Sequence, residues 1–583
     1  MRYKVIAQYH PAAALHQPRL WGVMLSDWEN FPTEVPHDYI ITKEHKIYPE
    51  TISLDTELSP NGGLGEWSVA YRNEQGKLAV ERYAGSRPNK VFNADVVFHN
   101  AKFDLRVLRA NRMQKPKGVH DTMIQAYCLG MGRQSPTDSS KEKSGSMMVG
   151  GLGLKYLARR HLGMEMKTWQ EVRDHPEMKA EYNDNDSVAT FLLDEKWRPI
   201  LPKHYFNIDM PLLDVLMTME DRGIAIDSGY LDTFSKGLEK QLGEIDLPIN
   251  PNSPQQIQSY VYGTLGIEPW KFTETGLPST DADVLESIDD PVIKDILKYR
   301  DLNKDKTTYM DNYVTGSKVD GRIHAEFKQT STATGRLSCA NPNLQNVPRD
   351  GDMRKLFIAA EGKKLVVLDY KQLEFIVLAA ITQDPVILKL LNEGYDFHTM
   401  TSMITGKSRT DIKPANFATI YGAQAWTISR ELGITTNEAK DLQNLIFTKM
   451  PGIKQYIDHQ RQVAREERKV INFFGRTRRL DAMYAPDWRV KQEGEREAIN
   501  TPIQGAAGEV VKLAMIDLHY THSAPMLLQV HDELVFEIPE KEAEDYAQWL
   551  REYVPKITLI NGVEFPVEVG VGNNWFEAKK EAK

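Results

Sequence analysis

The sequence predicts a multi-domain protein of mixed α/β and α+β class. Its 583 residues are far more than one hydrophobic core can organise, because a single domain usually holds roughly 100–200 residues. With 41% hydrophobic and 26% charged residues, the composition argues against collagen-like, disordered and coiled-coil chains. Short alternating apolar runs are interspersed with segments of helical period along the chain, which indicates both strands and helices.

The first part of the chain mixes strand and helix patterns. Strand patterns occur at 4–9, 50–58, 77–85 and 94–100, and helical patterns occur at 152–163 and 187–197. Residues 131–150 are rich in Ser, Gly and Lys and have no apolar period, so we expect a surface loop there. A domain boundary is expected near Leu201 and Pro202.

The rest of the chain is expected to be mostly helical from 205 to 330. Beyond it, strand patterns at 363–370 and 526–538 bracket a long helical region from about 385 to 515. We find neither an internal repeat nor a low-complexity tail.

Bulk charge and cysteine content limit the chemistry. The formal net charge of −9 argues, taken alone, against nucleic-acid binding. Cys128 and Cys339 are the only cysteines, so neither a disulfide framework nor a cysteine zinc site is expected, and any metal must be held by carboxylates. No apolar run approaches the ~18 residues that would suggest a membrane span.

A first group of acids has the pattern of a metal site. Asp55 and Glu57 lie two apart in a strand pattern and share one face, while Asp104 lies at or just inside a helix start. Tyr182 and Asp186 lie four apart on one helical face. Such a set would hold two divalent ions that activate water against a phosphodiester. The alternative is a set of unrelated surface acids, since the chain has 81 Asp and Glu residues.

A second acidic group flanks a stripe of cations and aromatic residues. Asp369 ends one strand pattern, and a predicted hairpin turn carries His531, Asp532 and Glu533. Between them a helix pattern repeats every four residues, which places its members on one stripe: Arg409, Lys413, Phe417 and Tyr421. Two cations followed by two aromatic rings suit a triphosphate and its base. The alternative is an ordinary amphipathic helix.

The N-terminal motifs resemble those of DEDD-type 3′→5′ exonucleases, which have a ribonuclease-H-like fold. The motifs, in the family's order, are Asp55-x-Glu57, Asn100-x-x-Phe103-Asp104, His120 to Met123, and Tyr182-x-x-x-Asp186. The resemblance implies that Asp55, Glu57 and Asp186 ligate one ion, that Asp104 helps to hold the second, and that Tyr182 orients the attacking water. No position of the set is substituted, so an active proofreading site is implied.

The remaining motifs resemble those of family A DNA polymerases, which include the large fragment of bacterial DNA polymerase I and phage replicative enzymes. They occur at 332–348, 369–375, the stripe above, 496–512 and 530–533, so with the exonuclease motifs the resemblance covers nearly the whole chain. It implies an exonuclease domain at 1–204 followed by a right-hand polymerase domain. The expected subdomains are a thumb at 205–330, a palm at 331–384 and 500–583, and fingers at 385–499.

The resemblance also assigns roles in the polymerase site. Asp369, Asp532 and the backbone carbonyl of Tyr370 would bind two Mg²⁺ ions, with Mn²⁺ as the alternative, and each site would hold two ions. Lys413 is the candidate general acid for pyrophosphate, and Glu374 matches the steric gate that excludes a ribose 2′-hydroxyl. The other expected nucleotide contacts are Gln372, His398, Arg409, Phe417 and Tyr421. The residues expected to hold the primer-template are Arg336, Gly422, Arg496, Asn500, Gln504 and His531.

The chain departs from the family pattern at a few positions. Pro414 predicts that the helix carrying the stripe begins or bends there. Phe375 replaces a frequent arginine, and Lys371 replaces a common serine. Before residue 50 there is no room for a 5′ nuclease domain, so we expect a phage-like or replicative architecture, and the thumb length leaves little room for a thioredoxin-type partner.

The expected partners are primer-template DNA, dNTPs, a single-stranded 3′ end and replisome proteins such as a helicase or single-strand-binding protein. We expect a soluble monomer with no membrane partner, in the cytoplasm of a bacterial or phage-infected cell or in an organellar matrix.

Other functions would need other residues. A nuclease with a decayed polymerase domain would lack Asp369 or Asp532, and a related RNA polymerase would carry a small residue at 374. A replication scaffold would not need two complete carboxylate sets. The net charge of −9 is unfavourable for binding DNA, but residues 461–480 carry a local net charge of +5, from seven Lys or Arg and two Glu. Because phosphate contacts depend on local positive charge, the net charge of the whole chain does not exclude DNA binding.

Overall fold

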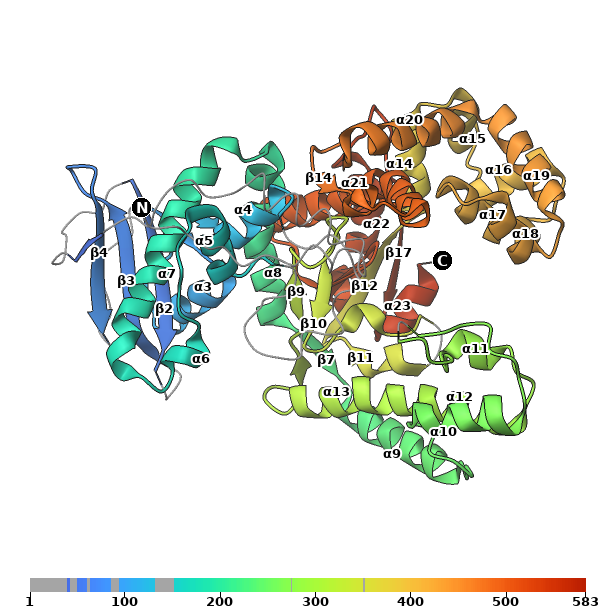
Figure 1. Ribbon diagram of the computed structural model, residues 1–583, viewed down its shortest axis with the longest axis horizontal. Coiled ribbons are helices and arrows are strands. Elements are labelled where there is room, and N and C mark those ends of the chain that lie inside the picture. Colours follow the sequence, from blue (N-terminus) through green and yellow to red (C-terminus); the bar gives the residue numbers. More distant parts are fainter. Residues whose placement is uncertain are drawn as a thin grey trace.

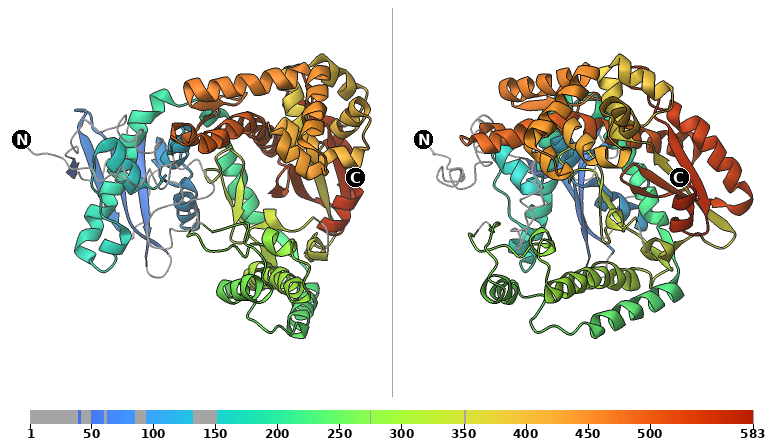
Figure 2. Two further views of the ribbon diagram at one scale, coloured as in Figure 1. Left: turned by 45° about the vertical axis from the view of Figure 1, so that its right-hand side comes forward. Right: turned by 90° about the vertical axis from the view of Figure 1, so that its right-hand side faces the viewer.

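The computed structural model describes residues 39–41, 50–59, 63–84, 94–131, 151–273, 275–349 and 352–582. Within the helix at 409–420, the side chains of Asp411, Pro414, Ala415, Phe417 and Ile420 are outside this description. The strand predicted at 4–9 and nearly all of the loop predicted at 131–150 also lie outside the described residues. Figure 1 shows a smaller N-terminal body beside a larger three-lobed body, and Figure 2 shows the same division from two further sides.

The N-terminal body is a mixed sheet covered by helices. Its strand order is β1-β4-β3-β2-β5-β6, with β2 antiparallel to β3 and parallel to β5. The strands are β1 (Ile40–Ile41), β2 (Thr51–Leu58), β3 (Leu64–Arg72), β4 (Leu78–Ala84), β5 (Asp95–Phe98) and β6 (Gly118–Asp121). The helices are α3 (Ala101–Ala110), α4 (Thr122–Cys128), α5 (Leu154–Leu162), α6 (Trp169–Val172) and α7 (Pro176–Trp197). The strands predicted at 50–58, 77–85 and 94–100 and the helices predicted at 152–163 and 187–197 are therefore confirmed.

The chain then passes through a 3₁₀ turn, Arg198–Ile200, and a π-helical turn, Tyr205–Asp209, before the lower lobe of Figure 1. Helix α8 (Met210–Arg222) comes first, and most of its buried hydrophobic side chains belong to the core of the larger body. The lower lobe contains α9 (Ser228–Glu244), α10 (Pro254–Gln258), α11 (Ala282–Glu286), α12 (Pro291–Lys304) and α13 (Asp311–Gly316). Its base carries a small sheet of order β11-β7-β8, formed by β7 (Ile224–Ile226), β8 (Arg322–Ile323) and β11 (Phe357–Ile358). The far end has its own apolar cluster around Ile257, Leu285 and Ile293. This lobe corresponds to the expected mostly helical segment.

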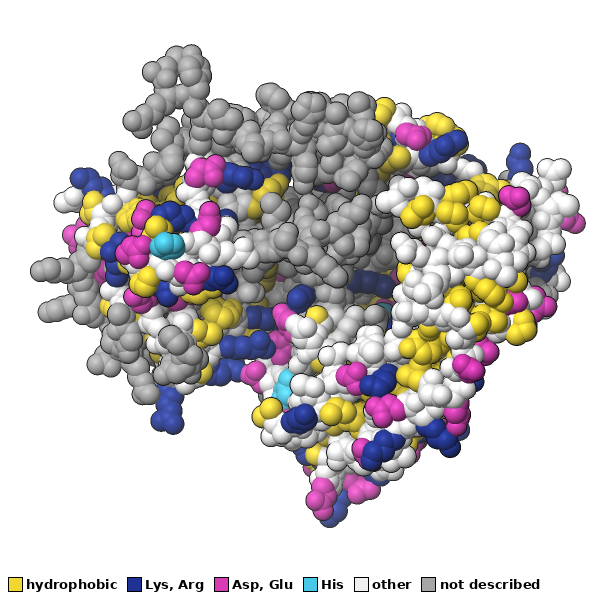
Figure 3. Space-filling view, turned by 60° about the horizontal axis from the view of Figure 1, so that its bottom comes forward, with side chains coloured by type: hydrophobic (Ala, Val, Ile, Leu, Met, Phe, Trp, Pro, Cys, Tyr) yellow, Lys and Arg dark blue, Asp and Glu magenta, His cyan; other side chains and the backbone are white. Residues whose placement is uncertain are grey.

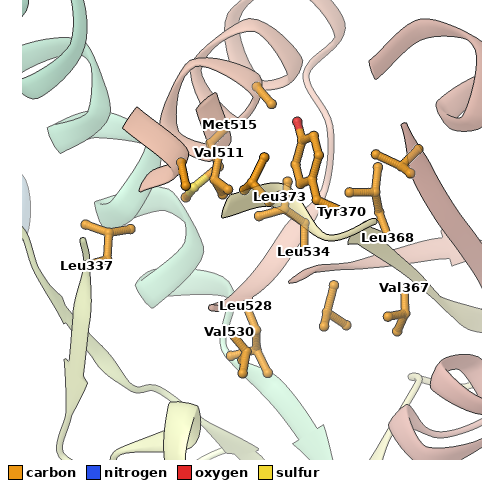
Figure 4. Packing of buried hydrophobic residues seen from close by; sticks show 14 of the residues in the cluster. Leu337, Val367, Leu368, Tyr370, Leu373, Val511, Met515, Leu528, Val530 and Leu534 are labelled. Carbon is orange, nitrogen blue, oxygen red and sulfur yellow. The ribbon is translucent and has the colours of Figure 1, made fainter. Parts of the chain in front are cut away.

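A four-stranded antiparallel sheet forms the centre of the larger body. Its order is β15-β16-β12-β17, from β12 (Lys363–Tyr370), β15 (Met526–Val530), β16 (Glu533–Pro539) and β17 (Val567–Gly572). A pair of short strands, β9 (Glu326–Lys328) and β10 (Ser338–Ala340), lies beside it. Helices α14 (Leu373–Thr382), α22 (Ala543–Tyr553) and α23 (Trp575–Glu581) complete the lobe. Leu368, Leu534 and Val511 belong to its continuous buried core, part of which Figure 4 shows.

The upper lobe is helical. It contains α15 (Pro385–Asn392), α16 (Phe397–Thr405), α17 (Arg409–Ile420), α18 (Ala425–Leu432), α19 (Thr436–Lys449) and α20 (Pro451–Glu467). A hairpin of β13 (Lys469–Ile471) and β14 (Thr477–Arg479) precedes the long helix α21 (Trp488–His522). Because α21 runs through residues 499 and 500 without a break, the expected fingers and palm share one helix. Among the described helices, none has the length and apolar character needed to cross a bilayer.

Candidate active sites

The first acidic centre is built on the central strand of the N-terminal sheet. In β2 the side chains of Asp55 and Glu57 are partly exposed while Thr56 between them is buried, as strand alternation requires. Thr56 turns inward and donates to Asp104 Oδ1 on α3, from its backbone nitrogen at 3.1 Å and its hydroxyl at 2.7 Å. Strand β2 and helix α3 therefore bring three of the predicted carboxylates together.

Helix α7 supplies the rest of this centre. It is tied to the sheet by hydrogen bonds from Ser53 Oγ to the carbonyl of Ser187 (2.7 Å) and from Ser68 Oγ to that of Asn183 (2.9 Å). Asn183 Nδ2 donates to Asp55 Oδ2 at 3.2 Å. Asp186, on the same helix, forms an ion pair with Lys155 of α5, and the Lys155 ammonium lies 4.0 Å from the centre of the Tyr182 ring. The predicted set is thus assembled, and Lys155 joins it.

Electrostatics show that this centre suits a hard cation. Burial, followed by repulsion from Glu57, raises the pKa of Asp55 to about 7, and burial also raises the pKa values of Glu57 and Asp104. Burial thus makes the ionised carboxylates unfavourable unless a cation lies beside them, and the Lys155 ammonium only partly offsets this for Asp55 and Glu57. Carboxylate oxygens in such an arrangement fit Mg²⁺ or Mn²⁺.

The motif from His120 to Met123 has a structural role, because its Asp121 fixes the position of two helices. The Asp121 carboxylate caps α4 by accepting from Met123 N at 2.8 Å, and it also accepts from Ala101 N at 2.7 Å. One carboxylate therefore fixes the starts of α3 and α4. Since Asp104 lies in the first turn of α3, Asp121 positions the acidic centre without belonging to it.

The second acidic centre lies where β12 and β16 pair. Their register places Asp369 opposite Glu533, and Tyr370 N donates to the Asp532 carbonyl at 3.1 Å. His531 and Asp532 form the two-residue hairpin turn that was predicted, with His531 in the left-handed region at φ 56°. Asp369, Asp532 and the Tyr370 backbone are therefore adjacent, and the two carboxylates present hard oxygen donors that suit Mg²⁺ or Mn²⁺.

Helix α23 contributes residues to this centre that sequence reasoning missed. Lys579 Nζ lies 2.6 Å from Asp369 Oδ2 and 2.8 Å from Glu533 Oε2. The buried Trp575 indole donates to Glu533, and the Arg354 guanidinium lies over that indole at 4.1 Å. Burial raises the pKa of Asp369, and the Lys579 ammonium partly offsets the rise. Lys579 shares no motif with the hairpin or with β12, so only the fold reveals its position.

Arg336 and Glu374 border the second centre. Glu374 lies in the first turn of α14 and forms an ion pair with Arg336, whose guanidinium also lies 3.8 Å from Asp532 Oδ1. A small pocket beside them is lined by Arg336, Gln345, Lys512, Gln529, His531 and Asp532. Gln372, which precedes α14 in the left-handed region at φ 42°, accepts a hydrogen bond from Phe397 N at 3.0 Å. The backbone that presents Glu374 is thereby joined to the upper lobe.

The predicted phosphate contacts lie on α16 and α17. Arg409 pairs with Asp396 at 2.6 Å, and His398 is buried with its Nδ1 at 3.0 Å from Asn416 Nδ2. Lys413 is exposed and has no ion pair within the described part of the chain. Helix α17 starts at Arg409, so of the two expectations for Pro414, a helix start or a bend, the start is excluded. Arg409 and Lys413 lie one turn apart on one helix, and Tyr421 directly follows its last residue.

Four of the six residues expected to hold the primer-template lie on one stripe of α21 and in the loop after α17, whereas Arg336 and His531 border the second acidic centre. Arg496, Asn500 and Gln504 recur every four residues of α21. The amide oxygen of Asn500 is buried and has no hydrogen-bond partner among the described residues. Gly422 has φ 69°, and a Cβ there would lie 2.4 Å from Ile499 Cδ1, so this position requires glycine.

The cationic segment at 461–480 does not form the free basic patch that its sequence suggests. Arg465 pairs with Glu495 at 2.7 Å, Arg478 pairs with Glu497 at 2.8 Å, and Arg476 is buried between Asp209 and Glu509. These acids come from elsewhere in the chain, which a count over twenty residues cannot include. Figure 3 shows a different face, the one toward the bottom of Figure 1, where Lys and Arg are interspersed with Asp and Glu over the described part.

Two substitutions relative to the family pattern have local explanations. Phe375 is buried and stacks on Phe397 with ring centres 4.2 Å apart, so an aromatic pair fills the position of the usual arginine. Lys371 pairs with Glu568 at 3.0 Å on the neighbouring strand β17. Neither side chain touches the predicted metal ligands.

Cys128, His204 and Asp209 are buried and close enough together to hold a metal ion, which the sequence did not suggest. However, the Asp209 carboxylate already accepts hydrogen bonds from the Arg476 guanidinium at 2.8 and 2.9 Å and from the Cys128 thiol at 3.2 Å. His204 Nδ1 lies 2.9 Å from the same carboxylate. Lys512 adds a second cation at 4.0 Å from Asp209. Because the positive charges of Arg476 and Lys512 already lie at Asp209, they would repel a metal ion. The cluster instead joins the N-terminal body to the larger body.

Comparison with known proteins agrees with this division. Residues 229–577 match the family model for DNA polymerase family A, and residues 40–202 match the model for a 3′-5′ exonuclease domain. The mixed-sheet body thus corresponds to the exonuclease match, and the three-lobed body corresponds to the polymerase match. The chain belongs to DNA polymerase family A.

Individual relatives give the same assignment. DNA polymerase I of Chloroflexus aurantiacus is 34% identical over 518 residues, covering 82% of this chain and 54% of that protein. The thermostable DNA polymerase I of Thermus aquaticus is 36% identical over 404 residues, covering 64% and 48%. The chain therefore spans about half the length of the curated relatives it matches. The polymerase domain of Pol1 from M. smegmatis, solved with a DNA primer-template and dNTP, aligns with TM-score 0.75 and 26% identity over 91% of this chain and 96% of that one.

Proposed function

We propose that this protein is a DNA-dependent DNA polymerase that extends a primer 3′ end with dNTPs and removes misincorporated nucleotides by 3′→5′ exonuclease action. The observation that carries the proposal is the presence of two complete acidic centres in one chain, one on β2, α3 and α7 and the other on β12 and the β15–β16 turn. The complex of the Pol1 domain with primer-template and dNTP supports the same substrates for this chain.

In the polymerase centre, Asp369, Asp532 and the carbonyl of Tyr370 would hold two divalent ions, with Mg²⁺ the natural choice for carboxylate ligands and a triphosphate. When bound, such ions lower the pKa of the primer 3′-hydroxyl and stabilise the departing pyrophosphate. The primer 3′-hydroxyl releases its proton to solvent, its oxygen forms a bond to the α-phosphorus, and the bond from that phosphorus to pyrophosphate breaks. Lys413 is suited to give pyrophosphate a proton, because its ammonium is exposed and unpaired within the described residues.

The residues around that centre would select and orient the nucleotide. Arg409 and His398 would contact phosphate oxygens, with Phe417, Tyr421 and Gln372 around the base and sugar. Arg336 holds the Glu374 carboxylate, which keeps the gate group in one position beside Asp532. The stripe Arg496, Asn500 and Gln504, together with Gly422 and His531, would follow the primer-template.

In the exonuclease centre, Asp55, Glu57, Asp104 and Asp186 would hold divalent ions, which supply an activated water when bound. Tyr182 would orient that water. The water oxygen bonds to phosphorus, the P–O3′ bond breaks, and one water proton ends on the 3′-oxygen of the shortened strand. The products are a deoxynucleoside monophosphate and a new 3′-hydroxyl. The further partners we propose are replisome proteins such as a helicase or single-strand-binding protein, with the chain itself acting as a monomer.

Reciprocal variants test the proposal. Asp532→Ala should abolish primer extension and leave degradation of a single strand intact, whereas Asp55→Ala with Glu57→Ala should do the reverse. Asp545→Ala, an exposed acid on α22, is the matched control and should retain both activities. Extension by Asp532→Ala, or simultaneous loss of both activities in each variant, would contradict the assignment of two independent centres.

A further inference from the structure

Lys155 is held in the exonuclease centre by the way α5 packs. Leu154, Leu157 and Ala158 of this helix are buried, which fixes its position. Lys155 extends from the adjacent side, and its side chain is only 22% exposed. Its ammonium therefore occupies a defined place in the fold.

The ammonium faces the groups expected to handle the ion and the water. It pairs with Asp186, lies 4.0 Å from the Tyr182 ring centre, and is close enough to Asp55 and Glu57 to affect both carboxylates electrostatically. The fourth carboxylate, Asp104, accepts its hydrogen bonds from Thr56 and not from Lys155. Lys155 thus contacts Asp186 and the Tyr182 ring, and it lies within electrostatic reach of Asp55 and Glu57.

A count of charges indicates what this cation does once the centre is filled. Two divalent ions would balance the four carboxylates, so the ammonium charge would remain uncompensated. Hydrolysis adds negative charge to the non-bridging oxygens of the phosphate, and a fixed cation beside them stabilises that charge. Without ions, the ammonium instead pairs with Asp186.

On these grounds we infer that Lys155 is a further catalytic residue of the exonuclease site, whose ammonium binds a non-bridging oxygen of the scissile phosphate. The inference rests on the proposed exonuclease function. In the step described above, Lys155 neither gains nor loses a proton. When ions and substrate bind, the Lys155 ammonium leaves its ion pair with the Asp186 carboxylate and binds the phosphate oxygen.

The first test compares Lys155→Met, Lys155→Arg and the exposed control Lys77→Met in single-turnover degradation of a labelled single strand with Mg²⁺. Lys155→Met should be about 100-fold slower at saturating DNA, which is the scale for losing one donor to a transition-state oxygen. Lys155→Arg should recover part of the rate, and Lys77→Met should match the wild type. All three should extend a matched primer normally, which shows that the chain has folded.

The second test identifies the atom that Lys155 contacts. Sulfur replaces either non-bridging oxygen of the terminal phosphodiester, and one diastereomer should slow the wild type clearly more than it slows Lys155→Met. If both diastereomers slow the two proteins equally, or if Lys155→Met keeps the wild-type rate, the inference is overturned. Absence of exonuclease activity in the wild type would instead contradict the proposed function.

A third readout does not depend on activity. Because the ammonium shares Asp186 with the expected ion, Mg²⁺ should raise the melting temperature of Lys155→Met more than that of the wild type. An equal or smaller rise would show that Lys155 does not occupy the ion's side of Asp186, and would overturn the inference.

Discussion

Arg476 lies in a buried ion-pair cluster between the two bodies. Its side chain is 5% exposed and reaches two carboxylates that are fully buried, Asp209 at 2.8 Å and Glu509 at 2.5 Å. Removing one partner of a buried ion pair costs about 3–5 kcal/mol, because the remaining charge stays buried. Lys512 lies 3.5 Å from Glu509 and would partly replace the lost cation, so we expect about 3 kcal/mol for Arg476→Met.

Hydrogen exchange of the native protein measures this cost locally, which avoids assuming two-state unfolding of a multi-domain chain. A loss of about 3 kcal/mol should speed exchange in α4 and around Asp209 by on the order of 100-fold. The matched control is Arg72→Met, since Arg72 pairs with Glu195 at a similar 2.7 Å but with 36% and 44% exposure. An exposed pair contributes about 0.2–1 kcal/mol, so exchange should rise less than about tenfold.

The effect should depend on pH in a defined direction. Burial alone would raise the pKa of Asp209, but Arg476, His204 and Lys512 together hold it well below its usual range. A depressed folded-state pKa contributes stability above the unfolded value of about 3.9 and loses it as pH falls further. The difference between Arg476→Met and the wild type should therefore be full at neutral pH and shrink below about pH 4. Equal effects of the Arg476 and Arg72 variants at pH 7 would refute this reasoning.

The remaining predictions concern the polymerase centre. Glu374→Ala should reduce discrimination against ribonucleotides by roughly 10- to 100-fold in competition assays, the scale of one specificity contact, and unchanged sugar selectivity would remove the gate assignment. Lys579→Met should lower the kcat of primer extension roughly tenfold, the scale of about 1.4 kcal/mol for a lost positioning contact, while single-strand degradation stays unchanged. Its exposed neighbour Lys580→Met is the control, and equal losses in both would contradict a positioning role. Gly422→Ala should impair extension and stability more than Gly433→Ala, because both have left-handed φ but only Gly422 would place a Cβ against Ile499; equal effects would show that the close approach is unimportant.

Much of the acidic chemistry could be predicted from the sequence because it follows local periodicity. Two-residue spacing in β2 placed Asp55 and Glu57 on one face, and four-residue spacing placed Tyr182 and Asp186 on one side of α7. The hairpin turn at His531 and Asp532 followed from two alternating apolar runs around a polar pair. In each case the relevant geometry is set within one element.

Contacts between distant elements could not be predicted in this way. Lys579 reaches Asp369 because α23 packs on the sheet, and Lys155 reaches Asp186 because α5 packs beside α7. For the same reason the cationic segment at 461–480 was misread: the acids that neutralise Arg465 and Arg478 lie on α21. The sequence also left open whether the helix starts or bends at Pro414, and only the fold shows that α17 starts at Arg409.

The measurement that tests the central claim most directly is extension of a primer with a mismatched 3′ nucleotide by the wild-type chain, using dNTPs and Mg²⁺. If one chain holds both a polymerase centre and a proofreading centre, the product should be full length and carry the corrected base, whereas Asp55→Ala with Glu57→Ala should retain the mismatch. A wild-type product that keeps the mismatch, or no extension after its removal, would contradict the account.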